Sequence, residues 1–186
     1  MGTHRIGLII GSLRRASINR RVATALIRLA PEELEFREIE IGDLPLYNQD
    51  DEASSMPSVE RLKAEIRGCD GLLFVTPEYN RSIPGVLKNA IDHASRPYGK
   101  HVFAGRPAGV VGVSIGALGT AAAQQHLRNI LAYLDVPTLG QPEVFLQFRP
   151  ELVDEHGDIG PGRRPFLQSF MLRFTDWVRR HAPAAP

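Results

Sequence analysis

Apolar runs alternate with amphipathic segments along almost the whole chain. The runs are short enough for strands, whereas the segments between them repeat apolar residues every three or four positions, as one face of a helix does. In the first such segment Ile18, Val22, Leu26 and Leu29 share a face. The predicted strands cover residues 6–10, 34–39, 71–76, 107–113 and 143–146. The predicted helices cover residues 18–29, 57–69, 85–94, 120–134 and 165–180.

This alternation predicts an α/β fold, a doubly wound parallel sheet of five strands with helices on both faces. Residues 71–76 form a continuous apolar run, as expected of a central strand, whereas residues 34–39 alternate apolar and charged side chains, as expected near an edge. With strand order 2-1-3-4-5, the loops after strands 1, 3 and 4 build the ligand crevice of such a sheet. Those loops lie around residues 11–17, 77–84 and 114–120.

Length and composition narrow the class of protein. The chain has 186 residues, and we expect one domain over residues 1–186 with a frayed tail at 181–186. It carries 22 Lys and Arg against 21 Asp and Glu, a net charge of +1, which argues against a general nucleic-acid or membrane surface. The lone cysteine, Cys69, is expected to be a small buried hydrophobe. Without a signal-peptide pattern or an apolar run of membrane-spanning length, we expect a cytoplasmic protein.

The turn after the first predicted strand has the composition of an anion site. Gly11 allows a sharp turn, and Ser12, Arg14, Ser17 and Asn19 stand where the next helix exposes its first N–H groups. Residues 1–30 hold six arginines and no acidic residue, so the local field favours an anion. The turn is neither a Walker A motif nor a dinucleotide fingerprint. The alternatives are that Ser17 or Asn19 only caps the helix, with the arginines solvated, or that these arginines are a basic arm for nucleic acid.

The two later loops suit a flat ligand. In the loop at 77–84, Tyr79 offers an aromatic face and Asn80 can both donate and accept, although a rigid turn with an exposed tyrosine is the alternative. In the loop at 114–120, Gly116 and Gly119 let the backbone approach a ligand. A phosphate site, a stacking surface and an amide-rich loop together describe a flavin mononucleotide (FMN) site.

The same stretches resemble the flavin-binding signatures of the NAD(P)H-dependent FMN reductase family, which is flavodoxin-like and includes bacterial quinone, azo-dye and chromate reductases. The resemblance rests on residues 11–19 and 77–92, and more weakly on 44–50 and 125–135. It implies FMN as cofactor, with NADPH or NADH as electron donor. The implied cofactor-binding residues are Ser12, Arg14, Ser17, Ile18, Asn19, Pro77, Glu78, Tyr79, Asn80, Ser82, Ser114, Gly116 and Gly119.

Further expectations follow from the resemblance. The flavin carries the chemistry, so neither a catalytic side chain nor a metal is expected, and His93 and His126 are interpreted as surface or packing residues. The electron acceptor is expected to be a quinone, a free flavin, an azo compound or a chromate-like oxidant. Family members are commonly dimers or tetramers, which implies a homodimer or homotetramer. The chain departs from the family at Gly119-Thr120, where members often have two glycines.

Three other functions fit parts of the sequence. Gly112-Val-Ser114-Ile-Gly116 matches the nucleophile elbow of an esterase, and Asp135 or Asp154 followed by His156 completes a triad in chain order. A flavodoxin-type electron carrier is the second, although such carriers are typically acidic. A structural or regulatory domain that has lost flavin is the third. The choice between NADH and NADPH depends on whether a side chain such as Arg81 meets a 2′-phosphate, and the sequence leaves it open.

Overall fold

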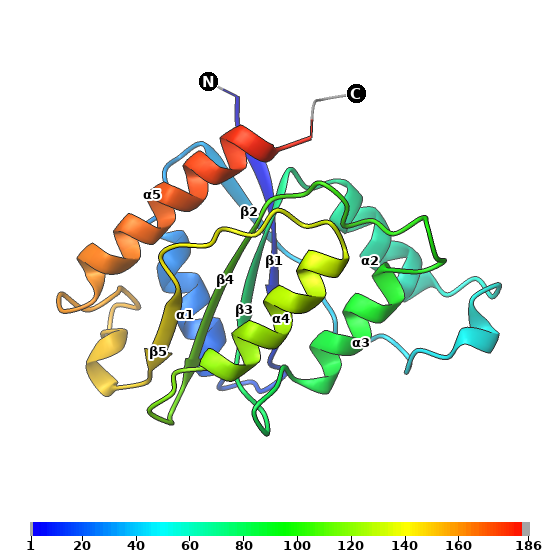
Figure 1. The fold of residues 1–186 in the computed structure, drawn as a ribbon. Helices are drawn as coiled ribbons and strands as arrows, with labels where there is room; N and C mark the ends of the chain where they lie inside the picture. The colour runs from blue at the N-terminus through cyan, green and yellow to red at the C-terminus, as the bar shows by residue number, and fades with distance from the viewer. Residues whose placement is uncertain (1, 184–186) are drawn as a thin grey trace.

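A sheet of five parallel strands lies at the centre of the fold, in the order β2-β1-β3-β4-β5, and helices cover both of its faces (Figure 1). The computed structural model describes residues 2–183. The strands are β1 (His4–Ile10), β2 (Leu34–Glu38), β3 (Gly71–Thr76), β4 (Ala108–Ser114) and β5 (Val144–Gln147). The helices are α1 (Ile18–Ile27), α2 (Pro57–Arg67), α3 (Gly85–Ala94), α4 (Ala121–Tyr133) and α5 (Arg164–His181). The predicted fold class and strand order are thereby confirmed.

The boundaries differ from the prediction by a few residues. Strand β1 begins at His4 because the half-buried His4 and the exposed Arg5 pair with β2, although no apolar pattern marks them. The predicted loops at 42–57 and 150–164 each contain a short 3₁₀ turn, Gln49–Asp51 and Pro150–Leu152. Helix α5 includes His181, which was predicted to begin the frayed tail, and the rest of that prediction at 184–186 lies outside the described residues.

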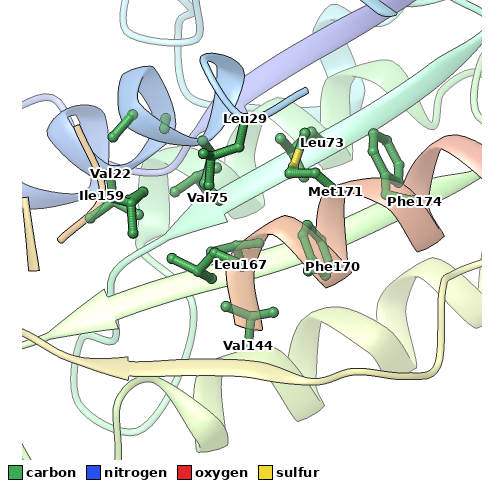
Figure 2. Close-up of a cluster of buried hydrophobic side chains, with 14 of the residues drawn as sticks. Val22, Leu29, Leu73, Val75, Val144, Ile159, Leu167, Phe170, Met171 and Phe174 are labelled. Carbon is green, nitrogen blue, oxygen red and sulfur yellow. The ribbon is translucent and has the colours of Figure 1, made fainter. Parts of the chain in front are cut away.

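The two faces of the sheet are covered by different helices. Helices α1 and α5 pack on one face, and α2, α3 and α4 pack on the other. On the first face Phe170, Met171 and Phe174 of α5 lie over the central strands (Figure 2). Helix α5 comes close because β4 has a glycine there: a Cβ on Gly109 would lie 2.9 Å from Cδ2 of Phe174. Of the helices within residues 2–183, none has both the length and the apolar composition needed to span a bilayer.

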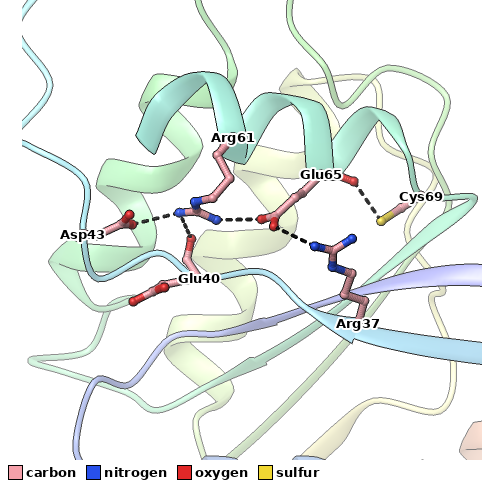
Figure 3. A network of polar contacts seen from close by, with 6 residues as sticks. All are labelled: Arg37, Glu40, Asp43, Arg61, Glu65 and Cys69. Carbon is pink, nitrogen blue, oxygen red and sulfur yellow. Dashed lines mark hydrogen bonds and ion pairs between the residues drawn. The ribbon is translucent and has the colours of Figure 1, made fainter. Parts of the chain in front are cut away.

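A network of hydrogen bonds and ion pairs between charged side chains links α2 to the segment that follows β2 (Figure 3). The guanidinium of Arg61 bonds to the carboxylates of Asp43 at 2.8 Å and Glu65 at 2.6 Å. One turn further on, the thiol of Cys69 donates to the carbonyl oxygen of Glu65 at 3.1 Å. Burial raises the pKa of the Cys69 thiol, so this cysteine is the neutral, buried residue that the sequence predicted.

Candidate functional site

The loops that follow β1, β3 and β4 lie along one edge of the sheet, below the strands in the view of Figure 1. Glycines let them approach one another. A Cβ on Gly11 would lie 2.7 Å from Oγ1 of Thr76, and a Cβ on Gly112 would lie 2.6 Å from the carbonyl oxygen of Thr76. Both distances are too short for a side chain. Loops that are far apart in the sequence therefore meet at the edge where the crevice was predicted.

The start of α1 combines a helix cap with unsatisfied amides. The hydroxyl oxygen of Ser17 accepts from the N–H of Arg20 at 3.2 Å, as the capping interpretation expected. The N–H groups of Ile18 and Asn19 have no acceptor within residues 2–183, and the buried hydroxyl of Ser12 makes no hydrogen bond there. Because the Ser17 hydroxyl still has its own proton to donate, the cap and an anion can share this turn.

The side chain of Asn19 has a different task from the one expected of it. It is 3% exposed, and its amide nitrogen donates to the carbonyl oxygen of Val113 at 3.0 Å. Its amide oxygen accepts from the N–H of Val113 at 3.1 Å. The side chain thus joins the first turn of α1 to β4. What Asn19 leaves available to a ligand is its backbone N–H.

Most arginines of the first thirty residues already have partners within the fold. Arg20 bonds to the carboxylate of Glu38, and Arg21 and Arg28 bond to groups in the segment 153–158. Arg14 and Arg15 are exposed and have no carboxylate partner within the described chain. The positive field at the turn therefore comes mainly from these two side chains. This arrangement speaks against a continuous basic arm for nucleic acid, because the side chains of Arg20, Arg21 and Arg28 bond to groups within the fold.

The loop after β3 contains a tight turn that the sequence did not reveal. Tyr79 and Ser82 exchange two backbone hydrogen bonds, of 2.9 and 3.0 Å. Between them Asn80 and Arg81 have positive φ angles of 52° and 67°, the left-handed conformation of a type I′ turn. Asparagine tolerates this conformation, but an arginine is strained in it. Tyr79 is 45% exposed at the base of the turn, where an aromatic ring can stack on a ligand.

Two side chains of this loop contact α4. Oε2 of Glu78 accepts from the N–H of Ala123 at 3.0 Å. Oγ of Ser82 and Nδ1 of His126 lie 3.0 Å apart and share a hydrogen bond. The carboxylate of Glu78 is therefore directed at the first turn of α4, although this residue was expected to line the flavin ring.

The two glycines of the loop after β4 are needed for different reasons. Gly119 has a φ of +56°, and a Cβ there would lie 2.8 Å from the backbone nitrogen of Leu146 in β5. Gly116 has ordinary φ and nothing closer than Oγ of Ser114 at 3.8 Å. Packing therefore requires Gly119, whereas the open space beside Gly116 suits a ligand that approaches the backbone.

Thr120 explains the departure from the family pattern. It has a φ of 81°, a value at which glycine is normally found. Threonine is held in this conformation by its surroundings, since it is fully buried and its Oγ1 accepts from Nε2 of Gln124 at 2.9 Å. The chain thus keeps the backbone geometry of a second glycine without having one.

The loop after β4 also carries two exposed apolar residues, Ile115 and Leu118, which the sequence analysis missed and which we call the apolar rim. Ile115 is 78% exposed and Leu118 is 50% exposed. Isolated exposed apolar residues are common, but these two flank Gly116 at the crevice. The sequence signal that could have revealed them is the position of apolar residues next to a glycine in a predicted loop. They provide a surface for a flat, largely apolar ring.

The esterase triad is not assembled. The hydroxyl of Ser114 donates to the carbonyl oxygen of Gly116 at 3.3 Å, and no histidine contacts it within the described residues. The His156 side chain is 78% exposed, and its Nε2 lies 3.8 Å from Oε1 of Glu155. Oδ1 of Asp154 accepts from the backbone N–H groups of its own turn, and these bonds lower the pKa of Asp154. This interpretation of the elbow motif is therefore wrong.

A cavity of about 490 Å³ lies away from the three loops. It is lined by the C-terminal halves of α3 and α4 and by the segment after α3, including Lys88, Tyr98, His101 and Tyr133. Because α3 and α4 begin at the carboxyl edge of the sheet, their ends lie toward the opposite edge. This cavity and the crevice predicted from the strand order are therefore separate features.

The fold defines a flavodoxin-like protein, and the turn after its first strand leaves backbone N–H groups at the start of α1 open to a ligand. Residues 4–151 match the family model described as NADPH-dependent FMN reductase, and the chain belongs to that family. The resemblance seen in the loop motifs is thereby confirmed.

Relatives of known activity match the chain over nearly its full length. It is 49% identical over 177 residues to a 2-hydroxy-1,4-benzoquinone reductase of Burkholderia, covering 94% of this chain and 96% of that protein. It is 44% identical over 174 residues to an NAD(P)H-dependent FMN reductase of Pseudomonas aeruginosa, covering 92% and 94%. The structure of FerB, a flavoenzyme NAD(P)H:(acceptor) oxidoreductase from Paracoccus denitrificans, matches with a TM-score of 0.93 at 41% identity, covering 97% of this chain and 100% of that one.

Proposed function

We propose that this protein is an NAD(P)H-dependent quinone reductase that binds FMN in the crevice formed by the loops after β1, β3 and β4. The observation that carries the proposal is the start of α1, where two backbone N–H groups and the Ser12 hydroxyl have no partner within the described chain and two exposed arginines have no carboxylate partner there. This turn lies at the same edge of the sheet as the loop at 77–84, which we call the stacking loop. Full-length identity of 49% to a benzoquinone reductase supports the choice of acceptor.

The residues present fit the two chemical parts of FMN. Arg14 with the hydroxyls of Ser12 and Ser17 would hold the phosphate, together with the N–H groups of Ile18 and Asn19. In the other loops, the residues that would face the ring system are Pro77, Glu78, Tyr79, Asn80, Ser82, Ser114, Gly116 and Gly119. Glu78 and Gly119 would contribute through their backbone, because the carboxylate of Glu78 binds α4 and Gly119 packs on β5.

The protein would position the flavin and its substrates and would supply the electrostatic environment of the site. When bound, FMN supplies the redox chemistry, a hydride taken from NAD(P)H and two electrons passed on to the quinone. The ring of Tyr79 and the apolar rim of Ile115 and Leu118 keep water from the face on which the substrates bind. Backbone N–H groups of the loop before α4 stabilise negative charge on the ligand, because they are fixed in place before it binds. No side chain has to form a covalent bond.

The same site would serve several acceptors and donors. A crevice that offers stacking and few directional contacts accepts flat oxidants, so free flavin and azo compounds are proposed as further acceptors, and a chromate-like oxyanion as another. Both NADH and NADPH are proposed as donors. By the family resemblance, we propose a homodimer or homotetramer located in the cytoplasm.

Absorbance of the purified protein tests this proposal. We expect the bands of bound FMN, their bleaching by NAD(P)H under nitrogen, and their return when 1,4-benzoquinone is added. Steady oxidation of NAD(P)H by the quinone without a partner protein distinguishes an enzyme from an electron carrier. A colourless protein that takes up no added FMN would exclude the proposal.

A further inference from the structure

Glu78 connects two of the three loops through the first turn of α4. Its side chain is 11% exposed, and its Oε2 accepts from the N–H of Ala123 at 3.0 Å. A helix leaves its first N–H groups without intrahelical partners, and a residue just before the helix usually satisfies them. Here Thr120 occupies that position but makes no capping bond with its side chain, and its hydroxyl oxygen accepts from Nε2 of Gln124 instead. The cap of α4 therefore comes from another loop.

The other oxygen of Glu78 faces the strained turn. Oε1 lies 3.7 Å from the guanidinium of Arg81, which has the left-handed φ of 67°. The contact between Ser82 and His126 adds a second tie between the same turn and the same helix. The stacking loop, the loop at 115–120 and the first turns of α4 thus form one connected unit, with the mostly buried carboxylate of Glu78 at its centre.

We propose that Glu78 is a positioning residue that fixes the stacking loop against α4 and sets, through its negative charge, how strongly the site favours reduced over oxidised FMN. The proposal rests on the proposed function, since it concerns the same site. The positive end of a helix dipole stabilises nearby negative charge, and reduction adds negative charge to a flavin. A carboxylate bound to that end offsets part of its field. Removing only the charge should therefore strengthen the binding of reduced FMN.

Glu78→Gln and Glu78→Ala separate position from charge. Glutamine keeps an oxygen that can accept from Ala123, so we expect E78Q to bind oxidised FMN within about twofold of the wild type. We expect its preference for reduced FMN to rise about tenfold, which corresponds to about +30 mV in the potential of a two-electron couple. E78A loses the acceptor as well, and we expect it to bind oxidised FMN about tenfold more weakly.

Glu60→Gln is the matched control. Glu60 lies in the first turn of α2, so E60Q makes the same change of charge near a helix N-terminus on a different helix. Redox titration of the FMN-loaded proteins with a reference dye, and fluorescence titration with FMN, give both quantities. An E78Q protein with the same preference for reduced FMN as E60Q would overturn the role of the charge.

Melting of the FMN-free proteins tests the positioning role without any ligand. We expect E78A to melt about 2–4 °C below the wild type and E78Q to melt close to it, because a helix cap is lost only in the first. Equal melting of E78A and E60Q would overturn this role. If the wild-type chain bound no FMN, the proposed function would fail, whereas the melting comparison would still decide whether Glu78 caps α4.

Discussion

At the scale of single residues, neighbouring polar side chains of the first turn have separate tasks. Ser17 caps α1, Asn19 joins it to β4, and Arg14 is left exposed without a carboxylate partner in the described chain. Sequence analysis placed all three in one phosphate site. It did not predict that the partner of Asn19 is Val113, 94 positions away, or that the partner of Glu78 is Ala123, 45 positions away. No local pattern predicts contacts over such distances.

Arg14→Ala should weaken FMN binding. A charge-assisted hydrogen bond contributes about 1.5–3 kcal/mol, so we expect the dissociation constant to rise roughly 10- to 100-fold. Arg20→Ala is the control, because Arg20 is already paired with Glu38. Fluorescence titration at two salt concentrations measures the effect, which should shrink at high salt. Equal losses in the two variants would mean that Arg14 does not contact the phosphate.

Asn19→Ala should act on stability. It leaves the N–H and C=O of Val113 without their partner in a buried strand, and we expect a loss of about 2–4 kcal/mol in the free energy of unfolding. Urea unfolding of the FMN-free protein measures it. Ser12→Ala is the control, since the Ser12 hydroxyl bonds to nothing within residues 2–183. An N19A protein as stable as the wild type would contradict the role given to this side chain.

At the scale of elements, hydrophobic periodicity predicted the order and type of strands and helices, because burial decides both. It failed where burial is incomplete. The first residues of β1, the half-buried His4 and the exposed Arg5, are held by backbone pairing with β2. The turn at 79–82 escaped prediction because Arg81 is an unusual residue for a left-handed conformation. Sequence patterns therefore predict packed elements better than the strained turns between them.

An ion pair that joins two elements should make stability depend on pH. Glu33, just before β2, bonds to Arg179 near the end of α5, and this hydrogen bond lowers the pKa of Glu33. A carboxyl group whose pKa is lowered on folding contributes stability above its unfolded pKa of about 4.3, and the contribution is lost as the pH falls through the folded value. Arg179→Ala should therefore lower the melting temperature at pH 7, and the difference from the wild type should shrink as the pH falls below about 4.3. A constant difference across this range would show that the ion pair does not contribute.

At the scale of the whole molecule, binding of FMN to the folded chain should stabilise all of it. At a free concentration 100 times the dissociation constant, the gain is about 2.7 kcal/mol. For a chain of this size we expect the melting temperature to rise by about 5–10 °C. Riboflavin, which has the same ring but no phosphate, is the control and should raise it much less. Equal shifts would show that the turn after β1 is not a phosphate site.

The left-handed conformations of Asn80, Arg81 and Thr120 have a consequence for how this protein can change. Asparagine tolerates such an angle, whereas arginine and threonine are strained in it. Glycine at 81 would relieve that strain while giving the turn more freedom. A variant with glycine in place of Arg81 should therefore lose backbone strain but hold the turn at 79–82 less rigidly.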